Sequence, residues 1–157
     1  MKEIFTHPFL VFLIGNIGTG KTTISKIIQT EYGGKIISLD EFKMENLEIE
    51  EPELTIKFRL LVEHELKHKN SLILDGKHLI RNHRTRLITY GKRYDIKVIA
   101  IDCGKGDEKS LQNRLNENRG LQVKEWEEEH FKSFWEYEEP TVEEGFNLIL
   151  KKEIFIF

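Results

Sequence analysis

The chain has 157 residues, of which 39% are hydrophobic and 32% are charged, and its formal net charge is −3 at pH 7. This length and composition are typical of one globular domain, here residues 1–157, and the charge argues against a protein that coats nucleic acid nonspecifically. No apolar run approaches the roughly 18 residues of a membrane span, the N-terminus lacks a secretory pattern, and the single cysteine, Cys103, allows no internal disulfide. These features predict a cytoplasmic protein with no membrane partner, and they leave the oligomeric state open.

An apolar run at residues 9–14 leads directly into a glycine-rich segment. The segment has the pattern GxxxxGK[ST], whose glycines allow backbone N–H groups to turn inward on a phosphate. We expect Lys21 to reach the β- and γ-phosphates and Thr22 to bind Mg²⁺. Apolar residues follow at helical spacing, so the phosphate would also face a helix N-terminus. The sequence thus predicts a site for ATP or another nucleoside triphosphate, formed by Gly15, Asn16, Ile17, Gly18, Thr19, Gly20, Lys21, Thr22 and Thr23.

Apolar runs and amphipathic stretches alternate along the rest of the chain. Besides residues 9–14, strands are predicted at 35–39, 71–74, 97–101 and 147–150. Helices are predicted after Gly20, around Leu54 and Phe58, and over 79–90 with an end at Gly91. This alternation is typical of βαβ units on a parallel sheet. We therefore predict an α/β fold of the P-loop NTPase or kinase type, in which a parallel sheet of about five strands is flanked by helices and carries a small helical lid.

Aromatic residues recur at helix-like spacing near the end of the chain. Trp126, Phe131, Phe134 and Trp135 form this stripe. Such a stripe is more often core than a platform for stacking bases, so we predict that it is buried. Cys103 follows a strand-like run and is predicted to be a small buried or rim residue, not a catalytic thiol.

Two carboxylates, Asp40 and Asp75, follow predicted strands. Ligands of an open parallel sheet gather at the carboxyl ends of its strands, so both side chains should lie beside the glycine loop. Phosphoryl transfer needs neutralised charge and an aligned nucleophile, often through an aspartate that accepts its proton. We predict that Asp75 holds Mg²⁺ directly or through water and that Asp40 is the general base. The alternatives are a turn residue for Asp75 and a helix N-cap for Asp40.

Basic residues suggest two further roles. Arg114 and Arg119 are predicted to clamp the γ-phosphate from a lid, where charge-assisted pairs are strong, and the alternative is that either is a surface arginine. Between Lys77 and Lys97, seven basic residues face one acidic residue, Asp95. This basic zone could meet the phosphates of an acceptor.

These motifs resemble those of small P-loop kinases of the polynucleotide 5′-hydroxyl kinase type, found in bacteriophage and bacterial end-healing enzymes. After residues 15–22, the resemblance continues through Leu39-Asp40-Glu41-Phe42-Lys43 and Asp75-Gly76-Lys77-His78, then through Arg81, Arg84, the lid arginines and residues 139–146. It implies that Asp40 activates a 5′-hydroxyl and that Lys43 contacts the nucleic-acid backbone. Lys77 and His78 replace a Thr-Asn pair of the family, and Lys43 stands where arginine is usual.

The leading prediction is an ATP- and Mg²⁺-dependent kinase with the 5′-hydroxyl of a DNA or RNA end as acceptor. Its partner would be that nucleic-acid end, bound by Lys43, Lys77, His78, Arg81 and Arg84. A kinase of a small molecule, a nucleotide or a modified base in DNA is a second hypothesis, favoured by Lys77 and His78. A P-loop switch or ATPase is the third, and a carboxylate at the position of Asp40 argues against it.

Overall fold

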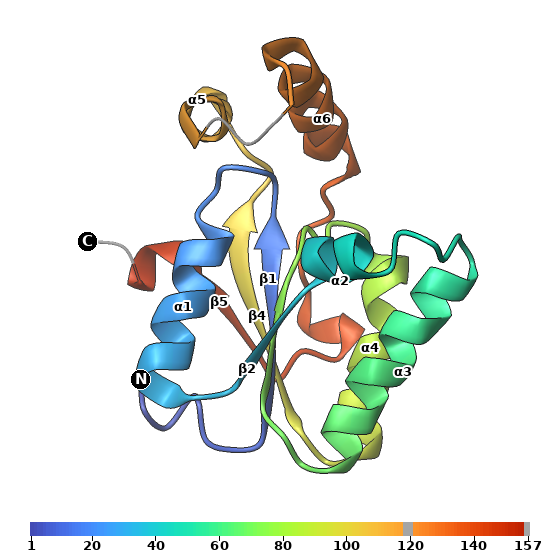
Figure 1. The fold of residues 1–157 in the computed structure, drawn as a ribbon. Helices are drawn as coiled ribbons and strands as arrows, with labels where there is room; N and C mark the ends of the chain where they lie inside the picture. Colours follow the sequence, from blue (N-terminus) through green and yellow to red (C-terminus); the bar gives the residue numbers. More distant parts are fainter. Residues whose placement is uncertain (118–120, 156–157) are drawn as a thin grey trace.

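The computed structural model describes residues 1–117 and 121–155, which form a sheet with helices on both faces (Figure 1). Five strands lie in the order β2-β3-β1-β4-β5, and all neighbours are parallel, which confirms the predicted α/β fold. The strands are β1 (Phe9–Gly15), β2 (Lys35–Ser38), β3 (Leu72–Asp75), β4 (Lys97–Gly104) and β5 (Leu148–Lys151). The helices are α1 (Lys21–Tyr32), α2 (Leu39–Glu45), α3 (Glu53–Lys67), α4 (Arg81–Arg93), α5 (Glu108–Glu117), α6 (Val123–Glu136) and the 3₁₀ turns η1 (Val142–Glu144) and η2 (Lys152–Ile154).

The central strand β1 is buried on both faces. Successive side chains of a strand point to opposite faces, and helices cover both faces of this parallel sheet. Leu10, Phe12 and Ile14 belong to the cluster that includes α3 and α4 residues, whereas Phe9 and Val11 belong to the cluster on the α1 side. The uninterrupted apolar run before the glycine loop is therefore explained by burial on both faces.

The sequence predicts that α4 ends at Gly91, but this helix continues to Arg93. Gly91 is a packing residue, because a Cβ at this position would lie only 2.7 Å from Cγ2 of Val98 on the neighbouring strand β4. The missing side chain thus allows α4 to approach β4 closely. Glycine near a helix end was misinterpreted as a stop signal.

Helices α5 and α6 lie beyond the carboxyl ends of β1 and β4, where they form the predicted lid (Figure 1). The prediction of a buried aromatic stripe on α6 was wrong for Phe131 and Trp135, which are 67% and 72% exposed. Because α6 projects past the sheet, only part of its surface packs against the domain. Within the described residues, no helix has both the length and the apolarity needed to cross a membrane.

Candidate active site

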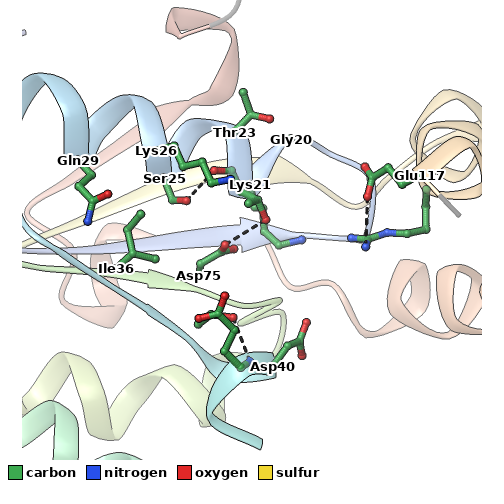
Figure 2. Close-up of a pocket in the computed structure, with 15 residues that line it drawn as sticks. Gly20, Lys21, Thr23, Ser25, Lys26, Gln29, Ile36, Asp40, Asp75 and Glu117 are labelled. Atoms are coloured by element: carbon green, nitrogen blue, oxygen red, sulfur yellow. Dashed lines mark hydrogen bonds and ion pairs between the residues drawn. The ribbon is translucent and has the colours of Figure 1, made fainter. Parts of the chain in front are cut away.

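A cavity of about 600 Å³ lies at the carboxyl ends of β1, β2 and β3 (Figure 2). We call it the phosphate-loop cavity. It is lined by parts of the glycine loop, α1, α2, β3 and α5, which are far apart in the sequence. The predicted site residues that line it are Gly18, Gly20, Lys21, Thr22, Thr23, Asp40, Asp75 and Arg114.

The glycines of the loop adopt a backbone conformation that other residues rarely adopt. Gly18 and Gly20 have φ values of 71° and 97°, in the left-handed region. A Cβ on Gly18 would lie 1.8 Å from the carbonyl oxygen of Ser110, so the loop also presses directly against α5. Within the loop, the Thr19 hydroxyl donates to the carbonyl oxygen of Asn16 over 2.6 Å. The conformation of the loop is thus stabilised by its own Thr19–Asn16 hydrogen bond and by packing against α5.

The first residues of the predicted phosphate-binding set do not offer free N–H groups. The backbone N–H groups of Gly15, Asn16 and Ile17 donate to oxygen atoms of the protein at 3.1, 3.1 and 2.7 Å. The N–H groups left for a phosphate therefore begin at Gly18 and include the first turn of α1, whose N–H groups lack helical partners. This turn starts at Lys21, so a phosphate there also faces the positive end of the helix.

The Lys21 side chain is buried, at 8% exposed, and folds back onto the loop. Its Nζ donates to the carbonyl oxygen of Asn16 over 2.8 Å. Burial lowers the pKa of Lys21 to about 8, against the opposing effect of nearby Cys103 and Asp75. Cys103 is buried as predicted, and burial raises the pKa of its thiol to about 12. A phosphate reaching Lys21 would replace the carbonyl with a stronger, charged acceptor.

Thr22 and Asp75 lie together, as a magnesium site requires. The Thr22 hydroxyl, in the first turn of α1, donates over 3.1 Å to Oδ2 of Asp75 at the end of β3. Magnesium in such sites takes one or two protein oxygens and completes its shell with water and substrate phosphates. The two side chains fit this ion, and no cluster of three or more His, Cys, Asp or Glu side chains in residues 1–117 and 121–155 offers an alternative cage.

Asp40 lies in the first turn of α2, which begins at Leu39 directly after β2, and it is not the N-cap that was the alternative in the sequence analysis. The N-cap is Ser38, whose hydroxyl accepts from the N–H of Glu41 at 3.2 Å. Asp40 is therefore not needed as a cap, and its exposed side chain lines the phosphate-loop cavity on the side opposite α1 (Figure 2). The predicted base and the predicted metal ligand, Asp75, meet in one cavity.

Arg114 of α5 enters this cavity from the lid. Its guanidinium lies 5.0 Å from the ring centroid of Trp126 on α6 and forms an ion pair with Glu117 at 3.5 Å. These contacts direct the arginine over the loop. Arg119, the second predicted lid arginine, lies outside the described residues.

Asn16 connects the glycine loop to the lid, a role that sequence reasoning missed. Its Nδ2 donates to the carbonyl oxygens of Lys105 and His130, both at 2.9 Å. His130 in turn pairs through Nε2 with the Ser110 hydroxyl at 2.8 Å, joining α6 to α5. The sequence indicated this role only by a polar residue, Asn16, at a position where the GxxxxGK[ST] pattern specifies no residue type.

A family model described as chromatin associated protein KTI12 matches residues 9–146. The chain belongs to the KTI12 family. No curated protein matches it in sequence.

Solved structures place this KTI12-family chain among P-loop kinase-like folds. A gluconokinase from Sinorhizobium meliloti 1021 has a TM-score of 0.63 and 14% identity, covering 92% of this chain and 82% of that chain. Chaetomium thermophilum Kti12 in complex with ADP-AlF3 has a TM-score of 0.58 and 20% identity, covering 90% and 87%. The Mycobacterium tuberculosis APS kinase CysC in complex with AMPPNP and APS has a TM-score of 0.64 and 16% identity, covering 92% and 88%. These likenesses confirm the P-loop fold.

The predicted acceptor residues of this KTI12-family chain do not form one surface. Lys43 and His78 line a separate cavity between α2, α3 and α4. Lys77 instead pairs with Glu129 of α6, and its Nζ donates to the Ser133 hydroxyl over 3.1 Å. Lys77 thus ties the loop after β3 to the lid.

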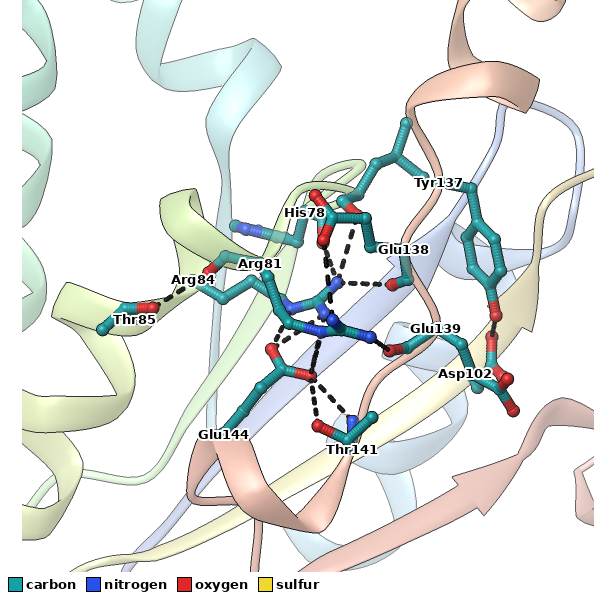
Figure 3. Close-up of polar contacts among 11 residues, drawn as sticks. His78, Arg81, Arg84, Thr85, Asp102, Tyr137, Glu138, Glu139, Thr141 and Glu144 are labelled. Carbon is teal, nitrogen blue, oxygen red and sulfur yellow. Dashed lines mark hydrogen bonds and ion pairs between the residues drawn. The ribbon is translucent and has the colours of Figure 1, made fainter.

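Arg84 corrects the sequence interpretation most clearly, because its side chain is 0% exposed (Figure 3). Its guanidinium binds both carboxylate oxygens of Glu144, at 2.8–3.0 Å, and donates to the carbonyl oxygens of His78, Leu79 and Glu138. It therefore cannot contact an acceptor phosphate in this fold.

Arg81 lies near the same carboxylate. Its Nε is 3.4 Å from Glu144, and its Nη2 donates to the carbonyl oxygen of Glu139 over 3.0 Å (Figure 3). The side chain is 43% exposed and lines neither cavity described here. Its predicted contact with an acceptor gains no support from this position.

The contact between Arg114 and Trp126 gives a prediction for nucleotide binding by this KTI12-family chain. A cation–π contact is worth about 0.5–2 kcal/mol, so replacing Trp126 with leucine should weaken Mg²⁺-ATP binding by about 2- to 30-fold. Isothermal titration calorimetry measures the dissociation constant. The matched control is Phe131→Leu, which removes an exposed ring from the same helix. Equal affinity of the Trp126 and Phe131 variants would contradict the prediction.

Proposed function

We propose that this KTI12-family chain is an ATP- and Mg²⁺-dependent phosphotransferase whose acceptor is the 5′-hydroxyl of a DNA or RNA end. One observation carries the proposal: Asp40 opens onto the same cavity as the phosphate loop, the Thr22–Asp75 pair and Arg114. A protein that only binds nucleotide needs no second carboxylate at this place. The pattern from Leu39 to Lys43, which resembles the acceptor motif of polynucleotide kinases, supports the choice of acceptor.

In the proposed reaction the acceptor oxygen attacks the γ-phosphorus, its proton passes to the Asp40 carboxylate, and the bond to the bridging oxygen breaks so that ADP leaves. Lys21 and the loop N–H groups hold the β- and γ-phosphates, and Arg114 stabilises the charge on the transferred group. Thr22 and Asp75 would hold Mg²⁺, which neutralises charge on the phosphates when bound.

The similar structures support nucleotide binding, because Kti12 was solved with ADP-AlF3 and APS kinase with AMPPNP. ATP hydrolysis without an acceptor is a second candidate. It is favoured by the family description, which names chromatin and no acceptor. A kinase of a small molecule, a nucleotide or a modified base in DNA is also compatible with a phosphate-loop cavity in which Asp40 acts as the general base.

The test is to incubate the protein with γ-labelled ATP, Mg²⁺ and separate acceptors: 5′-hydroxyl DNA, 5′-hydroxyl RNA, nucleosides and hydroxymethylated duplex. The proposal expects label on the 5′-hydroxyl strands and none on matched strands that already carry a 5′-phosphate. Lys21→Met, which removes the cation from the donor site, is the control for contaminating kinases. Label released only as inorganic phosphate, at a rate independent of acceptor, would establish the ATPase instead. Label on nucleosides or hydroxymethylated duplex alone would establish another acceptor.

A further inference from the structure

Helix α3 carries the sequence His64-Glu65-Leu66-Lys67-His68 at its carboxyl end. This sequence has the pattern HExxH, which places two histidines four residues apart on one face of a helix. In zinc peptidases the two histidines bind the metal and the glutamate is the general base. The end of α3 lies near the amino end of β2, away from the phosphate-loop cavity (Figure 1). The pattern therefore belongs to a different part of the molecule from the site described above.

The structure brings the two imidazole rings together. Their centroids are 4.5 Å apart, and both side chains are exposed. Bonds between Zn²⁺ and an imidazole nitrogen are roughly 2.0–2.1 Å long, so one ion can bridge two rings whose centres are this close. The His64 ring has no hydrogen-bond or ion-pair partner among the residues that the structure describes, which leaves its nitrogens open to a cation.

A hydrogen bond selects the nitrogen of His68 that can bind a metal. Its Nδ1 lies 2.8 Å from the carbonyl oxygen of His64. A carbonyl oxygen only accepts, so Nδ1 carries the proton and the lone pair of the neutral ring is on Nε2. Histidine ligands of metals usually donate their other nitrogen to such a partner, which fixes the tautomer and the orientation of the ring. His68 is therefore arranged as a metal ligand before any ion binds.

The end of a helix also favours a cation. His68 is the C-cap of α3, and the last carbonyl groups of a helix lack helical partners and form the negative end of its dipole. Lys67 and Lys69 flank His68 and oppose a second positive charge. Both are exposed, so water and salt screen them, and Nζ of Lys69 donates to the carbonyl oxygen of Tyr94.

Glu65 does not have the role that its position in the pattern suggests. Its Oε1 is 3.1 Å from Nζ of Lys35, and its Oε2 accepts from Nδ2 of Asn70 over 2.8 Å. The side chain is only 13% exposed, so this carboxylate joins α3 to β2 and is not available as a base. A catalytic zinc site also needs a third protein ligand, and no group of three His, Cys, Asp or Glu side chains in residues 1–117 and 121–155 provides one. The pattern thus favours metal binding without hydrolysis.

We propose that His64 and His68 together bind one divalent transition-metal cation of the Zn²⁺ class, with water in the remaining coordination positions. Imidazole ligands suit Zn²⁺, Cu²⁺ and Ni²⁺, whereas Mg²⁺ and Ca²⁺ prefer oxygen. The ion joins two successive turns of α3 and stabilises the end of this helix. The site does not depend on the proposed phosphoryl transfer.

Calorimetry measures Zn²⁺ binding in excess Mg²⁺, which occupies oxygen sites but competes poorly for imidazole. One ion should bind per chain. His64→Gln and His68→Gln should each weaken binding by about 10²- to 10⁴-fold, because the second ligand of a chelate is held close to the first. The control His83→Gln removes an exposed imidazole from α4 and should leave the affinity unchanged. Glu65→Gln should also bind Zn²⁺ as the unaltered chain does.

Hydrogen exchange locates the ion. Zn²⁺ should slow exchange of the backbone amides in the last turn of α3, and EDTA should reverse this effect. The His68→Gln variant should show no such protection. Equal Zn²⁺ affinity of the His64→Gln and His83→Gln variants, or protection confined to the phosphate loop, overturns the proposal. A loss in Glu65→Gln as large as in the histidine variants, or Glu65-dependent peptide cleavage by the Zn²⁺-loaded chain, overturns the assignment of a two-histidine site without hydrolysis.

Discussion

Asp40→Asn is expected to lower the turnover number for phosphoryl transfer by about 10²- to 10⁴-fold, the usual contribution of a general base. The amide keeps the shape of the side chain but cannot accept the proton of the attacking hydroxyl. The Kd for Mg²⁺-ATP should stay close to that of the unaltered protein, because Lys21, Thr22 and Asp75 remain in place. Label transfer under saturating ATP and acceptor measures the turnover number, and calorimetry measures the Kd.

Glu41→Gln provides the matched control for this variant. Glu41 neighbours Asp40 on α2 and lines the same cavity, so the substitution removes an equal charge from nearly the same place. A general electrostatic effect would slow both variants alike, whereas proton acceptance by Asp40 predicts a loss in one. Full transfer by Asp40→Asn, or an equal loss in Glu41→Gln, would refute the assignment of the base.

Arg84→Met is expected to lower the free energy of unfolding by about 3–5 kcal/mol, since it removes the buried guanidinium that binds both carboxylate oxygens of Glu144 and leaves only the more distant, partly exposed Arg81 as a cationic partner. Glu144 is 6% exposed, so water cannot replace the lost guanidinium readily. The carbonyl oxygens that Arg84 binds would also lose a donor. This loss is large against the 5–15 kcal/mol typical of a whole domain. Urea titrations followed by circular dichroism measure it.

Arg86→Met is the control for Arg84, because Arg86 is exposed on the same helix. Its cost should stay within about 0.5 kcal/mol. The double variant Arg84→Met, Glu144→Met should be more stable than Arg84→Met alone, because no unpaired charge remains in the interior. A single Arg84 variant as stable as the Arg86 variant would show that the buried pair has no such role.

The arrangement of the glycine loop, Lys21 and Asp75 around one cavity could be predicted because its signals are local. The glycine spacing before Lys21 and the position of Asp75 at the end of an apolar run specify both the backbone turn and the strand edge. Helix α2 was missed because a strand and a short helix adjoin without a break, and Ser38 was not identified as the cap. Asp40 was nevertheless placed beside the loop, since either structure leaves it at the edge of the sheet.

Roles that depend on distant partners could not be predicted. Arg84 lies in a basic stretch, and nothing nearby in the sequence indicates that Glu144 will neutralise it in the interior. The spacing of Phe131 and Trp135 defines a helical face but not what covers that face. A helix beyond the edge of the sheet has the same periodicity as one packed against it.

The pairing of Arg84 with Glu144 has a consequence for the growing chain. The two residues are 60 positions apart, so at about 5–20 residues per second the ribosome adds the carboxylate roughly 3–12 seconds after the arginine. Until then the Arg84 side chain, which donates to the carbonyl oxygen of His78, lacks the carboxylate that holds it in place. The glycine loop is made early, but the neighbouring pocket can take its final form only after nearly all of the domain has been synthesised.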